Sequence, residues 1–346
     1  FYEECTQAAI QEADVEGLIG KAVSRSKYKF SHDLVHKSCY EDTTLDIERH
    51  KLHLLVGRIL RAFYTSRPED DLLFAAVDHL NKGSHYLDTD DERIDLVQLN
   101  QKASEKARAR LALFSAANFS SKAIDILKFE HDWMNHYDLL LHVYNDAAEL
   151  NFACGRFDLS LRRCLEIHRH ARSLEDKLAA SYIRIEVLFS QKKIFEAIQS
   201  CLASLSSLGE PLAEKPASFQ ILAEWRKTKA MMKGLKPESL LSLPTMQCHI
   251  KRHTQRYLSL LVNMCFSVIN DKILPMAILK MFQNALAFGN CDLTPFSIAG
   301  YGMLCTFLGS CDEAAKYGRL AIQLCEKMES NICIPSTYAI VYSTLH

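Results

Sequence analysis

The segment 139–174 contains two amphipathic helical patterns separated by a short turn at Cys154-Gly155-Arg156. In each pattern, apolar side chains recur every three or four residues, which places them along one stripe of a helix. The two stripes comprise Leu139, Val143, Ala147, Leu150 and Cys154, and then Phe157, Leu161, Cys164, Leu165 and His168. Gly155 stands where the first helix must end, because glycine tolerates the left-handed conformation of a helix C-cap. A hairpin this short cannot bury both of its faces, so it predicts neighbours of the same kind.

Loosely similar turns recur at Lys192, Asp271 and Gly309, at successive spacings of 37, 79 and 38 residues. A small residue, which lets two helices approach closely, follows five positions after three of the four turns: Ser160, Ala197 and Ala314. The period is slightly longer than the ~34 residues of a tetratricopeptide repeat and shorter than most of the ~40–47 range of HEAT and armadillo repeats. The sequence therefore predicts an all-α fold, a tetratricopeptide-like solenoid of helical hairpins.

The composition supports a helical chain and limits the classes of partner that we expect it to bind. Of 346 residues only 12 are glycine and 8 are proline, which suits long helices joined by short turns. Lys and Arg number 41 against 42 Asp and Glu, a net charge of −1. A balanced chain gives no electrostatic reason to expect nucleic acid or a charged membrane surface as its partner. We therefore expect a protein partner.

The 12 cysteines are scattered singly, without any CxxC pair. This usage predicts free thiols in a reducing, cytoplasmic setting rather than a disulfide framework. No run of 18 apolar residues occurs, so no transmembrane helix is expected. The chain has no initiator Met and opens within a helical pattern at Phe1, which suggests a piece of a longer protein.

Three regions are expected along the chain. Residues 1–44 read as the C-terminal part of a winged-helix domain, in which the β-capable run 28–31 leads into a helix beginning near His32. Residues 45–130 form connecting helices, and residues 131–346 form the repeats. Helices are expected at about 45–64, 70–81, 91–110, 111–128, 176–190, 194–208, 218–233, 246–269, 276–288, 295–308 and 312–328, with a last one starting at Ser336.

Two short motifs in the first region resemble reactive sites. The run GLIGKA at 17–22 resembles a phosphate loop, but the spacing is short and Ala22 lacks the hydroxyl that would bind magnesium. The run 31–34, Ser-His-Asp-Leu, resembles the phosphoacceptor box of histidine kinases without its Arg and Pro. A helix cap around His32 is the favoured interpretation, since Ser and Asp accept amide hydrogen bonds at a helix start.

We also assign the histidines and aromatic residues to structural positions rather than to catalysis or metal binding. His249 and His253 have the i, i+4 spacing of metal ligands, but no HExxH glutamate or paired cysteine accompanies them, so we interpret them as surface histidines. Core positions are expected for Phe152, Phe157, Phe189 and Phe195, whereas Trp133, Trp225 and Tyr301 could line a groove. No serine-hydrolase, kinase or deaminase signature occurs. The sequence thus predicts no catalytic, cofactor-binding or metal-binding residue.

Several patches together resemble one family. Residues 30–40 (FSHDLVHKSCY) resemble a segment F-x-HDRVQxAAY, although Leu34 and His36 replace its Arg and Gln. Further similar patches are 52–60 (LHLLVGRIL), 79–83 (HLNKG), 288–302 and 317–321 (YGRLA). The segments occur in this order in the helical region that follows the STAND-type AAA ATPase core of multi-sensor hybrid histidine kinases and serine/threonine kinases.

The resemblance implies an ATPase upstream and sensor and kinase domains downstream, and ATP and magnesium would bind there. Their catalytic motifs are absent here, so no ATP-binding residue carries over to this chain. The leading hypothesis is a non-catalytic regulatory region that couples ATPase state or partner binding to kinase output. The alternative is a nucleotide-binding or phosphoacceptor fragment that acts through Lys21 and His32. A DNA-binding winged helix is a further rival, which the near-zero net charge disfavours.

Overall fold

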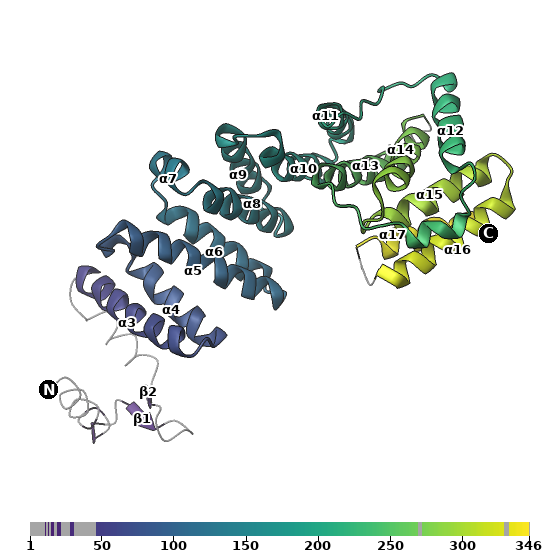
Figure 1. The fold of residues 1–346 in the computed structure, drawn as a ribbon. Coiled ribbons are helices and arrows are strands. Elements are labelled where there is room, and N and C mark those ends of the chain that lie inside the picture. The colour runs from purple at the N-terminus through teal and green to yellow at the C-terminus, as the bar shows by residue number, and fades with distance from the viewer. Residues whose placement is uncertain are drawn as a thin grey trace. The chain divides into compact units, whose positions relative to one another are not determined.

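The structure is a computed structural model. It describes residues 11, 13, 15, 16, 19–21, 28–30, 46–268, 272–328 and 332–345. By their internal contacts the residues form two compact units, Phe1–Asn135 and His136–His346 (Figure 1). Each unit is described by itself.

The described residues of the first unit include one pair of short strands. Strand β1 (Ile19–Lys21) pairs in antiparallel fashion with β2 (Tyr28–Phe30), which confirms the expected β-capable run. The helix expected near His32 lies outside the described residues. The assignment of residues 1–44 to a winged helix stays a prediction.

Five α-helices follow among the described residues of the first unit. They are α3 (Asp46–Ser66), α4 (Asp70–Lys82), α5 (Asp90–Ala109), α6 (Leu113–Ile126) and α7 (Phe129–Asn135), with a 3-10 turn η1 (Ser84–Tyr86) after α4. Helix α3 packs against α4 and α5 packs against α6, so neighbours in sequence form pairs. The pairs are joined because α4 also packs against α5. The expected helix at about 111–128 corresponds to α6, and α7 follows it as a further short helix.

The second unit contains ten α-helices among its described residues. They are α8 (Tyr137–Ala153), α9 (Phe157–His170), α10 (Leu174–Ser190), α11 (Ile194–Ser207), α12 (Ser218–Met232), α13 (His249–Val268), α14 (Ile273–Phe288), α15 (Thr294–Phe307), α16 (Cys311–Met328) and α17 (Ile334–Leu345), with a 3-10 turn η2 (Pro237–Ser242). Four consecutive pairs form, α8 with α9, α10 with α11, α13 with α14 and α15 with α16, and each pair contacts the next. This sequential packing is consistent with a helical array.

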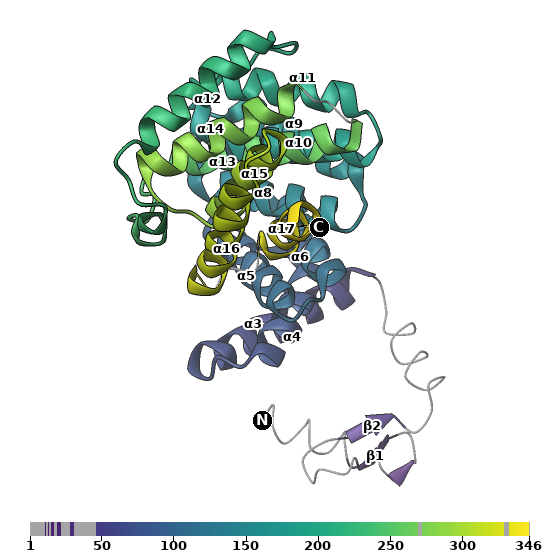
Figure 2. The ribbon, with the colours of Figure 1, turned by 90° about the vertical axis from the view of Figure 1, so that its right-hand side faces the viewer.

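Helix α12 interrupts the sequence of pairs. Helix α11 packs against α13, while α12 lies beside α14 (Figure 2). The interval of 79 residues between the turns at Lys192 and Asp271 therefore contains a single extra helix and η2 in place of a second hairpin. The sequence expectation of one helix at 218–233 in this irregular region is confirmed.

Three of the four predicted turns share one backbone geometry. At Gly155, with φ +72°, the amide donates to Phe152 O at 2.9 Å, and the next amide donates to Asn151 O at 2.8 Å. This pair of bonds is the Schellman arrangement that ends a helix. Lys192 and Gly309 also have positive φ, +64° and +78°, and the same bond pattern. The fourth turn, at Asp271, lies outside the described residues.

The small residue after each of these turns is buried, as the repeat pattern predicts. Ser160 lies between α8 and α9 and its hydroxyl donates to Ala148 O at 2.8 Å. Ala197 and Ala314 are 0% and 3% exposed. A larger side chain at these positions would push the paired helices apart, which explains why the pattern recurs.

Two expected core residues lie on the surface. Phe195 is 75% exposed and Leu165 is 48% exposed, so their assignment to buried stripes was wrong. In α11 the buried residues are Ala197, Ile198, Cys201, Leu202 and Leu205, which begin after Phe195. In α9 the buried position is Ile167 rather than Leu165. Phe152, Phe157 and Phe189 are partly buried.

Candidate functional site

Of the two motifs that resembled reactive sites, the structure describes only part of the first, residues 19–21. Lys21 belongs to β1, whose three residues pair with β2 as a strand. A phosphate loop instead requires irregular backbone that leads directly into a helix. His32 lies outside the described residues, so its role as a phosphoacceptor or as part of a helix cap stays a prediction.

The predicted histidine pair lies in the first turns of α13. The rings of His249 and His253 are 4.7 Å apart, and His249 Nδ1 lies 2.5 Å from Glu175 Oε1 of α10. Nδ1 of His253 is buried and has no hydrogen-bond partner. His249 is exposed and His253 is partly buried, so the interpretation as surface histidines holds for His249 alone.

Burial of His253 predicts a pH dependence of stability. Its pKa falls to about 4 because burial disfavours the charged ring, and the nearby charges of His249 and Arg256 act in the same direction. The folded pKa is thus below the unfolded value of about 6.5, so stability should fall as the pH drops from about 6.5 to about 4, by on the order of 1 kcal/mol. Urea denaturation across this range should show a weaker slope for His253→Gln. Equal slopes in wild type and His253→Gln would contradict the assignment.

An apolar groove in the second unit is the strongest candidate site. Its volume is about 730 Å³. Four helices contribute its lining residues, which are Ser218, Ile221, Leu222, Trp225, Cys265, Phe266, Leu274, Pro275, Leu279, Leu304, Phe307 and Leu308. Apart from one hydroxyl and one thiol, every lining side chain is apolar.

Large apolar side chains stand exposed around this groove. Phe307 is 74% exposed, Leu308 61%, Leu222 47% and Phe266 42%. Phe219, one turn before Leu222 on α12, is 73% exposed. Scattered exposed apolar residues are ordinary, but a contiguous apolar patch marks a surface for interaction. The groove therefore has the character of a binding surface for an apolar partner.

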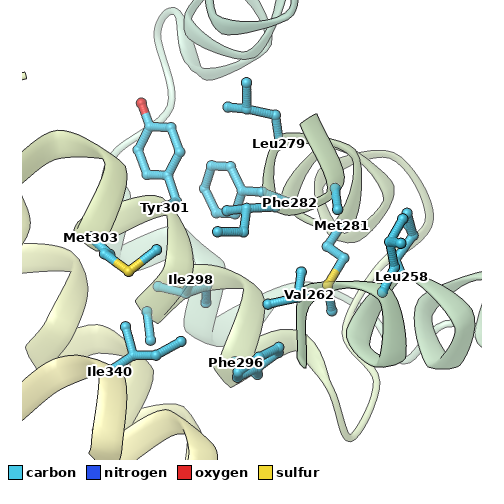
Figure 3. Close-up of a cluster of buried hydrophobic side chains, with 14 of the residues drawn as sticks. Leu258, Val262, Leu279, Met281, Phe282, Phe296, Ile298, Tyr301, Met303 and Ile340 are labelled. Atoms are coloured by element: carbon cyan, nitrogen blue, oxygen red, sulfur yellow. The ribbon is translucent and has the colours of Figure 1, made fainter. Parts of the chain in front are cut away.

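Stacked aromatic rings support the floor of the groove. Trp225 stacks on Tyr301, with ring centroids 5.2 Å apart and planes 15° apart. Tyr301 stacks in turn on Phe282 at 4.5 Å, and Figure 3 shows these two rings side by side in the buried cluster. Of the three aromatic residues expected to line a groove, only Trp225 does so. Tyr301 and Trp133 are core residues, 0% and 3% exposed.

Polar contacts hold α12 in place as one wall. Gln283 Nε2 of α14 donates to Thr228 Oγ1 and to Glu224 Oε2, each at 2.9 Å. Lys229 Nζ donates to Glu313 Oε2 of α16 at 2.7 Å. These contacts use the face of α12 that meets the array and leave Leu222 and Trp225 directed to the groove. Sequence reasoning missed the groove because an apolar stripe reads the same whether a neighbour covers it or not.

No helix in the described part of the chain is both long enough and apolar enough to cross a membrane. All ten cysteines that the structure describes are free, as their scattered spacing predicts. In the described residues, the fold is one of sequentially packed helices, and the second unit carries an open apolar groove. No model of a known protein family matches the chain.

The chain is distantly homologous to a signalling kinase over most of its length. It is 20% identical, over an alignment of 357 residues, to Hybrid signal transduction histidine kinase G of Dictyostelium discoideum. The alignment covers 92% of this chain and 10% of that protein. The chain thus corresponds to about a tenth of the length of this relative.

Proposed function

We propose that the chain is a non-catalytic, cytoplasmic regulatory region of a multidomain signal-transduction kinase and that its groove docks a polypeptide. The homology to part of a hybrid histidine kinase supports the setting. The single observation that carries the docking role is the groove with its exposed Phe and Leu side chains. Full burial of one such side chain is worth about 1.5–3 kcal/mol, so docking would depend on covering several of them together.

The finer fold that we propose is a tetratricopeptide-like solenoid. The repeated turn geometry and the buried small residues support it, since both recur with the hairpin period. Stacked repeats offer extended concave surfaces to partners because each repeat is rotated slightly relative to the one before it. Binding at one such surface would couple the state of an upstream ATPase to the output of a downstream kinase. ATP and magnesium would bind in those domains.

The docking role predicts that a charge in the groove changes signalling. In the full-length kinase that contains this region, Phe307→Asp should change autophosphorylation about tenfold or more, because the buried carboxylate would cost docking at least ~1.4 kcal/mol. Phe195→Asp is the matched control, since Phe195 is 75% exposed on α11, outside the groove, against 74% for Phe307. Thermal denaturation should show that both variants are folded. Unchanged autophosphorylation in both would contradict the docking role.

The non-catalytic role is tested with the chain alone. Incubation with radiolabelled ATP and magnesium should give neither hydrolysis nor incorporation of label. The alternative, a fragment with activity of its own, predicts phosphate on the chain that disappears in His32→Ala, or hydrolysis that disappears in Lys21→Ala. Either result would replace the regulatory proposal with that alternative.

A further inference from the structure

We infer that the occupant of the groove is an amphipathic α-helix that carries acidic side chains along the flank next to α12. The inference rests on the proposed docking function and names its partner. Three properties of the groove lead to it: the scarcity of polar groups, the form of the apolar wall and the charge on its lip.

The polar groups of the groove cannot satisfy an extended backbone. Leu222, Trp225, Leu279 and Leu304 belong to helices, whose N–H and C=O groups already bond within the helix. At the end of α15, the carbonyls of Cys305 and Thr306 are also used, since they accept the amides of Ser310 and Gly309, each at 2.9 Å. A strand in this groove would bury its own N–H and C=O groups without partners, at a cost of about 1–3 kcal/mol for each. A helix bonds its backbone internally and avoids this cost.

The apolar wall suits one face of a helix. Ile221, Leu222 and Trp225 lie at helical spacing on α12, and Phe266 and Phe307 come from other helices that line the same groove. A volume of about 730 Å³ is that of a cavity for several large side chains. A helix presents several apolar side chains on one face when they occupy positions i, i+3 or i+4, and i+7. Side chains with this spacing could enter together while the helix axis stays outside.

The lip of the groove selects acidic partners. Arg226 follows Trp225, is exposed, and forms no ion pair within the part of the chain that the structure describes. The carboxylates on the same wall and beside it are already neutralised, because Glu224 lies 3.5 Å from Lys280 Nζ and Glu313 lies 2.7 Å from Lys229 Nζ. A carboxylate on the occupant would therefore meet an available guanidinium, which favours approach and sets orientation.

A selection from a random library of 16-residue peptides displayed on phage tests the inference with the whole chain as target. Counter-selection uses the Leu222→Asp variant, and Phe195→Asp serves as a folded control that should still bind. We expect enriched peptides to carry apolar residues three or four positions apart, with Asp or Glu beside them. The best peptide should bind Leu222→Asp at least tenfold more weakly than wild type.

Two further measurements test separately the helical conformation of the occupant and the acidic charge on its flank. A proline at the centre of the best peptide should weaken binding at least tenfold, because proline breaks a helix. Arg226→Glu should weaken binding of acidic peptides about three- to tenfold, less so at high salt, because salt screens exposed charges. Apolar residues at alternate positions, or binding unaffected by proline, would overturn the helix. A basic flank in the enriched peptides would overturn the charge match.

Failure of the inference and failure of the docking function give different results. If the enriched peptides lack the helical spacing or the acidic flank but still need Leu222 for binding, the docking function stands and only the inference of an acidic amphipathic helix fails. If no peptide distinguishes wild type from Leu222→Asp and the chain dimerises in sedimentation through the groove, a second copy is the occupant and the inference is wrong. If neither peptide nor second copy binds, both the inference and the docking function fail.

Discussion

Replacing Asp132 by alanine is expected to destabilise the first unit by about 3–5 kcal/mol, because it removes the carboxylate that pairs with the buried guanidinium of Arg93. Asp132 is 0% exposed and Arg93 is 7% exposed. Arg93 donates from Nη1 to Oδ2 at 2.5 Å and from Nη2 to Oδ1 at 2.8 Å. Asp132 Oδ2 also accepts the amide of Lys128 at 2.7 Å, at the start of α7. The carboxylate thus fixes α7 to α5. Its loss leaves both Nη groups of Arg93 without these acceptors in a buried site, and only Nε keeps a partner, Asp90 Oδ1 at 3.3 Å.

The same contacts give this prediction its pH dependence. Burial by itself opposes ionisation of Asp132, but the hydrogen bonds from Arg93 and the Lys128 amide outweigh it and hold the pKa below its usual value. Since the folded pKa is the lower one, this stabilisation is present above the unfolded pKa of about 3.9 and is lost as the pH falls through the folded value.

Urea denaturation of wild type, Asp132→Ala and Asp132→Asn measures the effect. The amide keeps the shape and loses the charge, so Asp132→Asn should fall between the other two. Two controls isolate the mechanism. Arg93→Met combined with Asp132→Leu removes both charges and should be much milder than Asp132→Ala. Arg110→Ala breaks an exposed pair with Asp70 and should cost about 0–1 kcal/mol. Equal losses for the exposed and buried pairs would contradict the argument.

Gly289→Ala is expected to destabilise the second unit by about 3 kcal/mol or more, because strain and a clash with backbone add together. Gly289 has φ +98° and ψ −173° after α14, a conformation that residues with a side chain rarely adopt. A Cβ there would lie 2.1 Å from the carbonyl oxygen of Pro244. That oxygen accepts the amide of Asn290 at 2.7 Å, and Asn290 O accepts the amide of Met246 at 2.7 Å. The added methyl group must break this junction between two loops.

Gly309→Ala is the matched control for this prediction. Gly309 also has positive φ, +78°, but a Cβ there would meet nothing within 4 Å. Its substitution should therefore lower the free energy of unfolding by only about 1–2 kcal/mol, the penalty for placing a side chain in the left-handed conformation. Thermal denaturation of both variants gives the comparison, and a loss at Gly289 no larger than at Gly309 would show that the Pro244 contact relaxes without cost.

The helices and turns are the parts of this fold that could be predicted well. The pattern at 70–81 predicts α4, and that at 194–208 predicts α11, each within a residue or two. Gly155 marks the end of α8, since the backbone there needs a conformation that glycine adopts easily. These features depend on residues within one or two turns of each other, so the local sequence contains the information.

The candidate site could be predicted only in part. The sequence predicted that Trp225 and Tyr301 could both line a groove. Trp225 does line it, whereas Tyr301 is a buried core residue beneath it. Phe307 and Phe195 are both exposed and both follow helical patterns, yet only Phe307 borders the groove. Nothing near either residue in sequence distinguishes the two, because the neighbours that form the groove come from other helices.

By itself, the sequence determined that this protein is built of helices in consecutive pairs and where most of those helices begin and end. Hydrophobic periodicity and turn chemistry act over a few residues, so they can be read without a fold. Only the tertiary structure decided which apolar side chains remain uncovered and which charged side chains meet. Arg93 and Asp132 lie 39 positions apart, and Lys229 and Glu313 lie 84 apart. Such contacts depend on how whole helices pack, and that packing created the groove beside α12.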